Sequence, residues 1–314
     1  MIRSAFCTMY PSLNSRALGL DLPAKATLEL ASEAGFEGVD LMVRDIVESG
    51  GDLRELRARM NDLGLRGGAW PLPVTWRADG ERFAHDLGRL PKLAAAAAAL
   101  ALTRTGTWVM PETPERPESE AARADHLAAI GDLHLQRLGA IARVLAEHGC
   151  RLGLEVIGVA SSRTGRGWPF VTRLAELDRW LGTLWDEAPN LGILLDGFHL
   201  YAAGETIEAG LKWGVDRVVW VHLADLPAAA TPDRGAIRDD DRGLPDECGV
   251  IDSRSLLQRL AEGGYDGPVT VEPLGTCRSL AGLKAGSAIR KAATALRAVW
   301  PEEMRPCRLV SGSP

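Results

Sequence analysis

Short β-forming runs alternate with amphipathic helical stretches along nearly the whole chain, and this alternation restricts the fold more than any other feature. Strands are expected at residues 3–8, 38–42, 65–70, 104–109, 151–157, 191–196, 217–222 and 268–272. The helices expected between them include 24–34, 53–63, 126–148, 171–185 and 253–263. Strands that alternate with helices in this way build parallel sheets, and eight such units close a barrel. We therefore predict an α/β fold, a single-domain (β/α)8 TIM barrel.

The main alternative is an open doubly wound sheet. No Gly-x-Gly-x-x-Gly turn follows the first predicted strand, which argues against a dinucleotide-binding version of that fold. The 314 residues contain no evident linker, and barrels of this length are commonly one domain. We expect the barrel to occupy residues 1–300 and a C-terminal tail to occupy residues 301–314. The long, charged segment 226–249 is expected to be a functional or disordered loop.

Charge and cysteine content limit the partners and the compartment. Lys and Arg total 36 against 42 Asp and Glu, a formal net charge of −6, so no basic surface for nucleic acid or an anionic membrane is expected. The longest apolar run, residues 93–102, is too short to span a bilayer. Five scattered cysteines without a Cys-x-x-Cys pair, and no apolar leader, favour a reducing, cytoplasmic location.

Acidic and histidine side chains gather at the predicted carboxyl ends of the last four strands, where TIM barrels carry their active sites. The segments are GLEVIG with Glu155, LLDGFHLY with Asp196 and His199, VWVHLAD with His222 and Asp225, and VTVEPLG with Glu272. Each residue stands at or near the end of an apolar run, so a carboxylate there is partly removed from water.

A cluster of three such carboxylates repels itself unless it is protonated or holds a cation. Three oxygen ligands and one imidazole suit a divalent ion such as Mn2+, Mg2+ or Co2+. A single acidic residue at a strand end can equally cap a helix or form a surface ion pair. The four residues together therefore carry the prediction of a metal site, and no one of them does so alone.

The motifs GLEVIG, LLDGFHLY, VHLAD, RGLPDECGVID and GYDGPVTVEPL resemble those of the sugar phosphate isomerase/epimerase superfamily, the xylose isomerase-like TIM barrels of the AP endonuclease family 2 type. The resemblance covers most of the chain and is densest over residues 152–274. It implies a divalent metal, most readily Mn2+, a small carbohydrate substrate, and a homo-oligomer as in many members. The implied metal ligands are Glu155, Asp196, His222 and Glu272, and the implied substrate-contacting residues are His199 and Arg242.

The resemblance also implies a reaction. Glu155 and Glu272 bind the metal and exchange protons with a substrate whose enediolate the metal stabilises. The expected function is a metal-dependent isomerase or epimerase of a ketose or related polyol. The alternatives are a lyase or dehydratase on the same site, acting on an inosose or an oxidised glycoside, and a non-catalytic carbohydrate-binding barrel. Asp225 is expected to orient the metal ligands without binding the metal itself, with loop capping as the alternative.

Tryptophan is unusually frequent among the aromatic residues, with nine Trp against five Phe and three Tyr. Trp70 ends the third predicted strand, and Trp108 stands near the end of the fourth. Aromatic faces at a barrel mouth exclude water and stack on the C–H face of a sugar ring. We expect Trp70 and Trp108 to contact the substrate, with core packing as the alternative for both. Such a wall suits a bulky or cyclic substrate.

Overall fold

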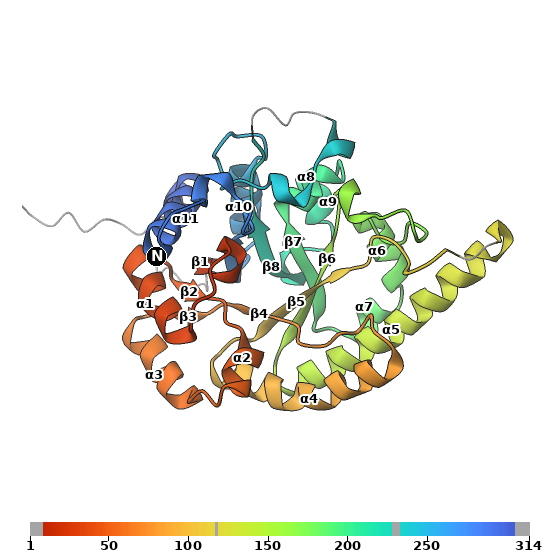
Figure 1. Ribbon diagram of the computed structural model, residues 1–314, viewed down its shortest axis with the longest axis horizontal. Coiled ribbons are helices and arrows are strands. Elements are labelled where there is room, and N and C mark those ends of the chain that lie inside the picture. Colours follow the sequence, from red (N-terminus) through yellow and green to blue (C-terminus); the bar gives the residue numbers. More distant parts are fainter. Residues whose placement is uncertain (1–8, 117–118, 228–232, 305–314) are drawn as a thin grey trace, which may run out of the picture.

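The computed structural model in Figure 1 describes residues 9–116, 119–227 and 233–304. Its nine parallel strands form one sheet in the order β3-β2-β1-β9-β8-β7-β6-β5-β4. The strands are β1 (Tyr10–Leu13), β2 (Gly38–Val39), β3 (Arg66–Gly67), β4 (Ala69–Pro71), β5 (Arg104–Val109), β6 (Arg151–Val156), β7 (Leu191–Asp196), β8 (Val218–Leu223) and β9 (Pro268–Val271). Because β3 and β4 share the third position, the nine strands fill eight positions of a nearly closed barrel. The predicted single-domain TIM barrel is confirmed.

Helices surround the strands, as Figure 1 shows. They are α1 (Ala24–Ala34), α2 (Val43–Glu48), α3 (Leu53–Asp62), α4 (Gly80–Ala99), α5 (Arg123–Glu147), α6 (Leu174–Leu181), α7 (Leu184–Glu187), α8 (Gly197–Ala202), α9 (Ile207–Gly210), α10 (Ser253–Glu262) and α11 (Ala285–Val299). Local signals set their ends. The Asp52 side chain accepts two backbone N–H groups at the start of α3, and Gly35 ends α1 with a left-handed φ of 78°.

The third barrel position differs from the prediction of one strand over 65–70, because β3 and β4 are separated at Gly68. The Gly68 N–H donates to the carbonyl of Val39. A Cβ at Gly68 would lie 2.1 Å from Asp40 Oδ1 and 2.3 Å from Ser12 Oγ, so only glycine fits there. The Asp40 and Ser12 side chains therefore occupy the space that a side chain at position 68 would need.

Three further expectations concern the ends of elements and of the chain. The predicted first strand, residues 3–8, lies outside the described residues, and β1 at Tyr10–Leu13 pairs with both β2 and β9. The helix expected over 171–185 is divided into α6 and α7, since Gly182 adopts a φ of 48° between them. Of the expected tail 301–314, residues 301–304 are described and include a 3-10 turn at Glu302–Met304.

The barrel interior has an apolar floor. Ala69, Leu194 and Trp220 form a small buried cluster, and since β4 pairs with neither β7 nor β8, they meet across the inside of the barrel. A Cβ at Gly106 would lie 2.6 Å from Leu194 Cδ1, so glycine makes room for this floor. Alternate residues of a strand share a face. The side chains two residues after these floor residues on the same strands therefore also point into the barrel, above the floor.

Candidate metal centre

The four predicted ligands meet above this floor. Glu155 lies on β6, Asp196 ends β7, His222 lies on β8 and Glu272 follows β9. One ligand atom from each residue lies within 4.8 Å of the others. The four strands are neighbours in the barrel, so their carboxyl ends bring the side chains together from four successive positions.

Several polar atoms in this cluster are buried without a hydrogen-bond partner, namely Glu155 Oε1 and both ring nitrogens of His222. His222 Nδ1 lies 3.0 Å from Glu272 Oε2 and 3.7 Å from Glu155 Oε1, without hydrogen-bond geometry. Unpartnered buried polar atoms cost free energy. A divalent cation would satisfy them, and three carboxylates with one imidazole form a donor set that suits such an ion. The residues present therefore fit a divalent metal.

The charges in the cluster shift one another's titration. Burial raises the pKa of Glu155 to about 7, and the neighbouring charges of Glu272 and Asp196 act in the same direction. Burial also favours a higher pKa for Asp196, but the positive charge of Arg242 outweighs it and holds that pKa below its ordinary value. The pKa of His222 is raised well above its ordinary value, because Glu272 and Glu155 overcome the opposing effect of burial.

Asp196 also organises the start of α8. Its Oδ1 accepts the backbone N–H groups of Phe198 at 2.7 Å and His199 at 3.2 Å. This N-cap fixes the carboxylate, because the helix end needs an acceptor in that place. It also turns His199 toward the cluster, where His199 is buried and its Nδ1 has no partner.

Arg242 lies inside the ligand cluster. Its Nη1 donates to Asp196 Oδ2 at 2.8 Å, and its Nη2 lies 3.0 Å from His199 Nε2 and 3.1 Å from Asp239 Oδ1. The guanidinium also lies 4.3 Å from the centre of the Phe198 ring. Arg242 thus balances the negative charge of the ligands, a role that sequence analysis did not assign. Its expected contact with substrate stays a prediction.

Asp225 is fully buried, and its carboxylate is used by the loop that follows. Its oxygens accept five backbone N–H groups at 2.7–3.1 Å, from Leu226, Cys248, Gly249, Val250 and Ile251. These are the contacts of the loop-capping alternative, and they hold the segment that contains Arg242 against the barrel. Asp225 therefore acts on the site through the loop.

Sequence analysis missed Asp40, which lies on the same mouth of the barrel. Its Oδ1 accepts from Ser12 Oγ and the Ala69 N–H, each at 2.7 Å, and its Oδ2 accepts from Thr270 Oγ1 at 2.6 Å. Burial raises the pKa of Asp40 to about 6. An acid within the apolar stretch Gly-Val-Asp-Leu-Met was the available signal.

The two tryptophans that were expected to contact the substrate lie in different parts of the structure. Trp70 is 1% exposed and packs in the large core cluster, whereas its neighbour Ala69 belongs to the barrel interior, so Trp70 faces the outer helices. The structure does not bring it to the metal cluster. Trp108 is 42% exposed, and it helps to line a pocket of about 450 Å³ together with Ile157 and Asp239. Of these two tryptophans, Trp108 is therefore the one that reaches a pocket, and its contact with substrate stays a prediction.

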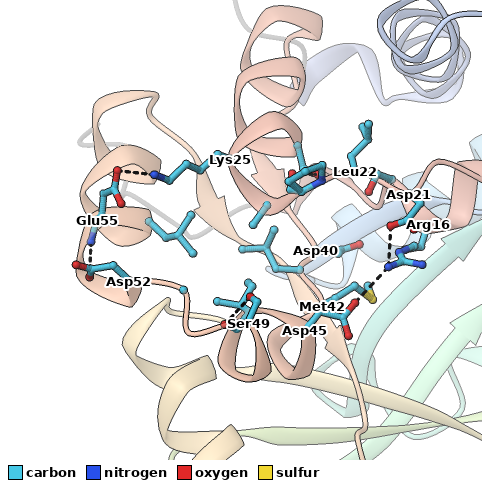
Figure 2. Close-up of a pocket in the computed structure, with 18 residues that line it drawn as sticks. Arg16, Asp21, Leu22, Lys25, Asp40, Met42, Asp45, Ser49, Asp52 and Glu55 are labelled. Atoms are coloured by element: carbon cyan, nitrogen blue, oxygen red, sulfur yellow. Dashed lines mark hydrogen bonds and ion pairs between the residues drawn. The ribbon is translucent and has the colours of Figure 1, made fainter.

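Another pocket, of about 620 Å³, lies beside α1, α2 and α3. Figure 2 shows that its cations are paired with carboxylates. Lys25 Nζ lies 2.6 Å from Glu55, and the Arg16 guanidinium lies 2.9 Å from Asp21 and 3.2 Å from Asp45. Its cations are already neutralised, unlike the polar groups of the metal cluster.

Among the described residues, no helix combines the length and the apolar character needed to cross a bilayer. Two solved structures share the fold. A xylose isomerase domain protein from Alicyclobacillus acidocaldarius subsp. acidocaldarius is 26% identical with a TM-score of 0.76, over 93% of this chain and 98% of that one. The IOLI protein with a bound zinc atom is 20% identical with a TM-score of 0.71, over the same shares of the two chains, and this likeness concerns the fold alone.

Two curated relatives are enzymes. An inosose isomerase of Halalkalibacterium halodurans is 34% identical over 83 residues, which are 26% of this chain and 28% of the relative. A 3-dehydroshikimate dehydratase of Pseudomonas putida is 27% identical over 303 residues, which are 96% of this chain and 43% of the relative. The chain thus spans less than half the length of the curated relatives it matches.

The motifs at the strand ends, the nearly closed barrel and the four converging ligands agree with a match to a family model. That model is described as a xylose isomerase-like TIM barrel, and it matches residues 28–299. The resemblance noted in the sequence motifs is confirmed: the chain belongs to the xylose isomerase-like TIM barrel family.

Proposed function

We propose that the protein is a divalent-metal-dependent isomerase or epimerase of a ketose or related polyol. The observation that carries the proposal is the convergence of two carboxylates on one buried imidazole. Glu155 and Glu272 both lie within 4 Å of His222 Nδ1, although they come from β6 and from the segment after β9. Two carboxylates from separated strands can approach a small substrate from different sides.

Isomerisation and epimerisation beside a carbonyl both begin with removal of a proton from carbon. In the proposed reaction, one of Glu155 and Glu272 accepts this proton, and the other returns a proton to the adjacent carbon or to the opposite face. A divalent cation, when bound, stabilises the negative charge that develops on the substrate oxygens. Asp196 and His222 serve as ligands, and His199 offers its free Nδ1 to a substrate hydroxyl.

Several details belong to the same proposal. We take Mn2+ as the resident ion, with Mg2+ or Co2+ as alternatives, and the zinc atom in a structural relative is consistent with a divalent ion. The exposed ring of Trp108 offers an apolar wall for the C–H face of the substrate. The proposal also includes a small carbohydrate substrate, no nucleic-acid or membrane partner, a cytoplasmic location and a homo-oligomeric state.

A lyase is the second candidate, favoured by the similarity of 96% of this chain to a dehydratase. Elimination of water starts with the same proton abstraction, so Glu155 and Glu272 serve both reactions. The outcomes differ only after that step. The intermediate expels a leaving group in the lyase, whereas it is reprotonated in the isomerase. An inosose isomerase among the relatives supports the first candidate.

The test is incubation of the Mn2+-loaded protein in D2O with ketoses, inososes, 3-dehydroshikimate and oxidised glycosides, followed by NMR. Deuterium at the carbon beside the carbonyl with a new sugar signal supports the isomerase, and a dehydrated or released product supports the lyase. Glu272→Gln should reduce exchange by at least about 100-fold. The control Glu37→Gln changes an exposed carboxylate just before β2 and should keep the wild-type rate. Absence of exchange from a protein that binds Mn2+ would refute both candidates.

A further inference from the structure

A cation without a carboxylate partner lies on the wall of the barrel mouth across from the metal ligands. Arg77, in the loop after β4, stacks on Trp108 with its Cζ 3.6 Å from the ring centre. Its Nη1 donates to the Trp108 carbonyl at 2.7 Å and lies 3.5 Å from Thr107 Oγ1. Within the described part of the chain, no carboxylate lies within ion-pair distance of Arg77.

The position of Trp108 places this cation beside the substrate space. Gly106 faces the apolar floor inside the barrel, so Trp108, two residues further along β5, faces the same interior near the mouth. Trp108 is also in register with Glu155 on the neighbouring strand. The Arg77 guanidinium, stacked on the Trp108 ring, thus borders the space above the ligands from the side of β4 and β5.

Arg77 keeps hydrogen-bonding capacity after these contacts. A guanidinium has five N–H donors, and the two contacts described use only Nη1, which leaves those of Nε and Nη2. Burial lowers the pKa of Arg77 to about 10, and no neighbouring acid offsets this effect. The arginine and lysine in the pocket of Figure 2 show the contrast, since carboxylates already neutralise both.

The charge of the metal cluster determines where an anionic group of a substrate can go. Three carboxylates and the Arg242 guanidinium surround the ligand space, so a bound divalent ion brings the charge of this cluster to about zero and leaves no uncompensated cation there to attract a further anion. A guanidinium across the mouth attracts such a group, and its flat fork matches a carboxylate in geometry.

We propose that Arg77 binds a carboxylate of the substrate, so that the preferred substrate is a hydroxy-ketone that also carries an acid group. This inference rests on the proposed function, because it assumes that the ketone end lies at Glu155 and Glu272. The apolar face of Trp108 lies between the two polar ends and covers the carbon skeleton.

The test compares matched acid and neutral probes on the Mn2+-loaded protein. One pair is 3-dehydroshikimate and its methyl ester, and the other is D-fructuronate and D-fructose. For the pair that is accepted, the wild type should favour the acid in kcat/KM by about 10-fold to 100-fold, the range of hydrogen bonds to charged groups. Arg77→Met should remove this preference, so that the acid and the neutral probe of the pair react with similar kcat/KM, while Arg77→Lys should restore part of it.

A matched control separates carboxylate binding from general support by a stacked arginine. Arg116 lies 4.2 Å over the Trp168 ring and donates to the Gly167 carbonyl, so Arg116→Met removes a similar contact in another loop. This variant should keep the acid preference. An unchanged preference in Arg77→Met, or its loss in Arg116→Met instead, overturns the assignment. Proton exchange with the neutral probes alone also overturns it but leaves the proposed function intact, whereas no exchange with any probe contradicts the proposed function itself.

Discussion

Asp40 illustrates how a single buried residue links strands that are distant in sequence. Its carboxylate accepts from Ser12 on β1, from the Ala69 N–H on β4 and from Thr270 on β9. Thr270 Oγ1 in turn accepts from Trp220 Nε1 at 2.9 Å, and the Trp220 ring packs edge-on to His222 with centroids 4.4 Å apart. The network therefore extends from the second strand to the metal ligand on β8.

The raised pKa of Asp40 has a consequence for stability. The folded protein holds this proton up to about pH 6, whereas the ordinary pKa is 3.8. Because the unfolded chain releases the proton first, the contribution of Asp40 is favourable below about pH 4 and is lost as the pH rises through 6. The difference amounts to roughly 3 kcal/mol. Asp40→Asn carries no charge, so its free energy of unfolding relative to wild type should rise by about this amount between pH 4 and pH 7.

Urea unfolding of both proteins at several pH values measures this change. Ser12→Ala is the control, because it removes one hydrogen bond to Asp40 and leaves the carboxylate in place. It should cost about 1 kcal/mol, and because the Ser12 hydrogen bond lowers the pKa of Asp40, it should retain or slightly increase the pH dependence of the wild type. A constant difference between Asp40→Asn and wild type across this pH range would contradict the assignment.

The metal ligands and Asp40 differ in how far the sequence predicts them. Glu155, Asp196, His222 and Glu272 each stand at the end of an apolar run, and strand order alone brings such ends together. Asp40 has the same local setting, but its partners are a serine, a threonine and a backbone amide. Those groups are common in strands and carry no distinctive signal. Arg242 was placed near the substrate, and only the folded loop shows that it pairs with Asp196.

At the scale of elements, the loop after β8 depends on one carboxylate. Asp225 accepts N–H groups from Cys248 to Ile251, and its backbone pairs with Gly243 as an isolated antiparallel bridge. Arg242 precedes Gly243, so the same anchor positions its guanidinium. The loop carries little regular secondary structure, and backbone groups inside a protein need such partners.

Asp225→Asn should therefore weaken both the fold and the site. The amide keeps one acceptor oxygen and directs N–H donors toward backbone N–H groups, so a loss of about 3 kcal/mol in unfolding free energy is expected. Activity should fall more than the stability change alone explains, because Arg242 loses its position. Asp233→Asn is the matched control, since Asp233 is exposed and caps one N–H at Gly235. Equal effects of the two substitutions would argue against the anchor.

Element boundaries were predictable wherever a local signal marks them. The strand at Arg104–Val109 and the helix at Ala24–Ala34 match the expected bounds, since apolar patterning and a terminal glycine define them locally. The need for glycine at position 68 was not predictable, because the Asp40 and Ser12 side chains that exclude a larger residue come from other parts of the chain. Long-range contacts of this kind override local pattern.

At the scale of the molecule, the barrel brings together ligands that are far apart in the chain. Glu155 on β6 and Glu272 after β9 are three strand-to-strand steps apart, and only the closed fold places them within reach of one ion. The unfolded chain has no such preformed site. Binding of the proposed metal would therefore be coupled to folding, and stability becomes a readout of the site that does not require a substrate.

Mn2+ should accordingly raise the free energy of unfolding of the whole barrel. An ion that binds only the folded state adds about 2.7 kcal/mol at a concentration 100 times its dissociation constant. Thermal unfolding with EDTA and with increasing Mn2+ measures the gain, which should decrease at lower pH because protons compete for His222 and the carboxylates. Asp196→Asn removes one ligand and should abolish most of the gain. Asp52→Asn, which alters the N-cap of α3 away from the cluster, should retain it. A similar Mn2+ response in both variants would mean that the ion binds elsewhere.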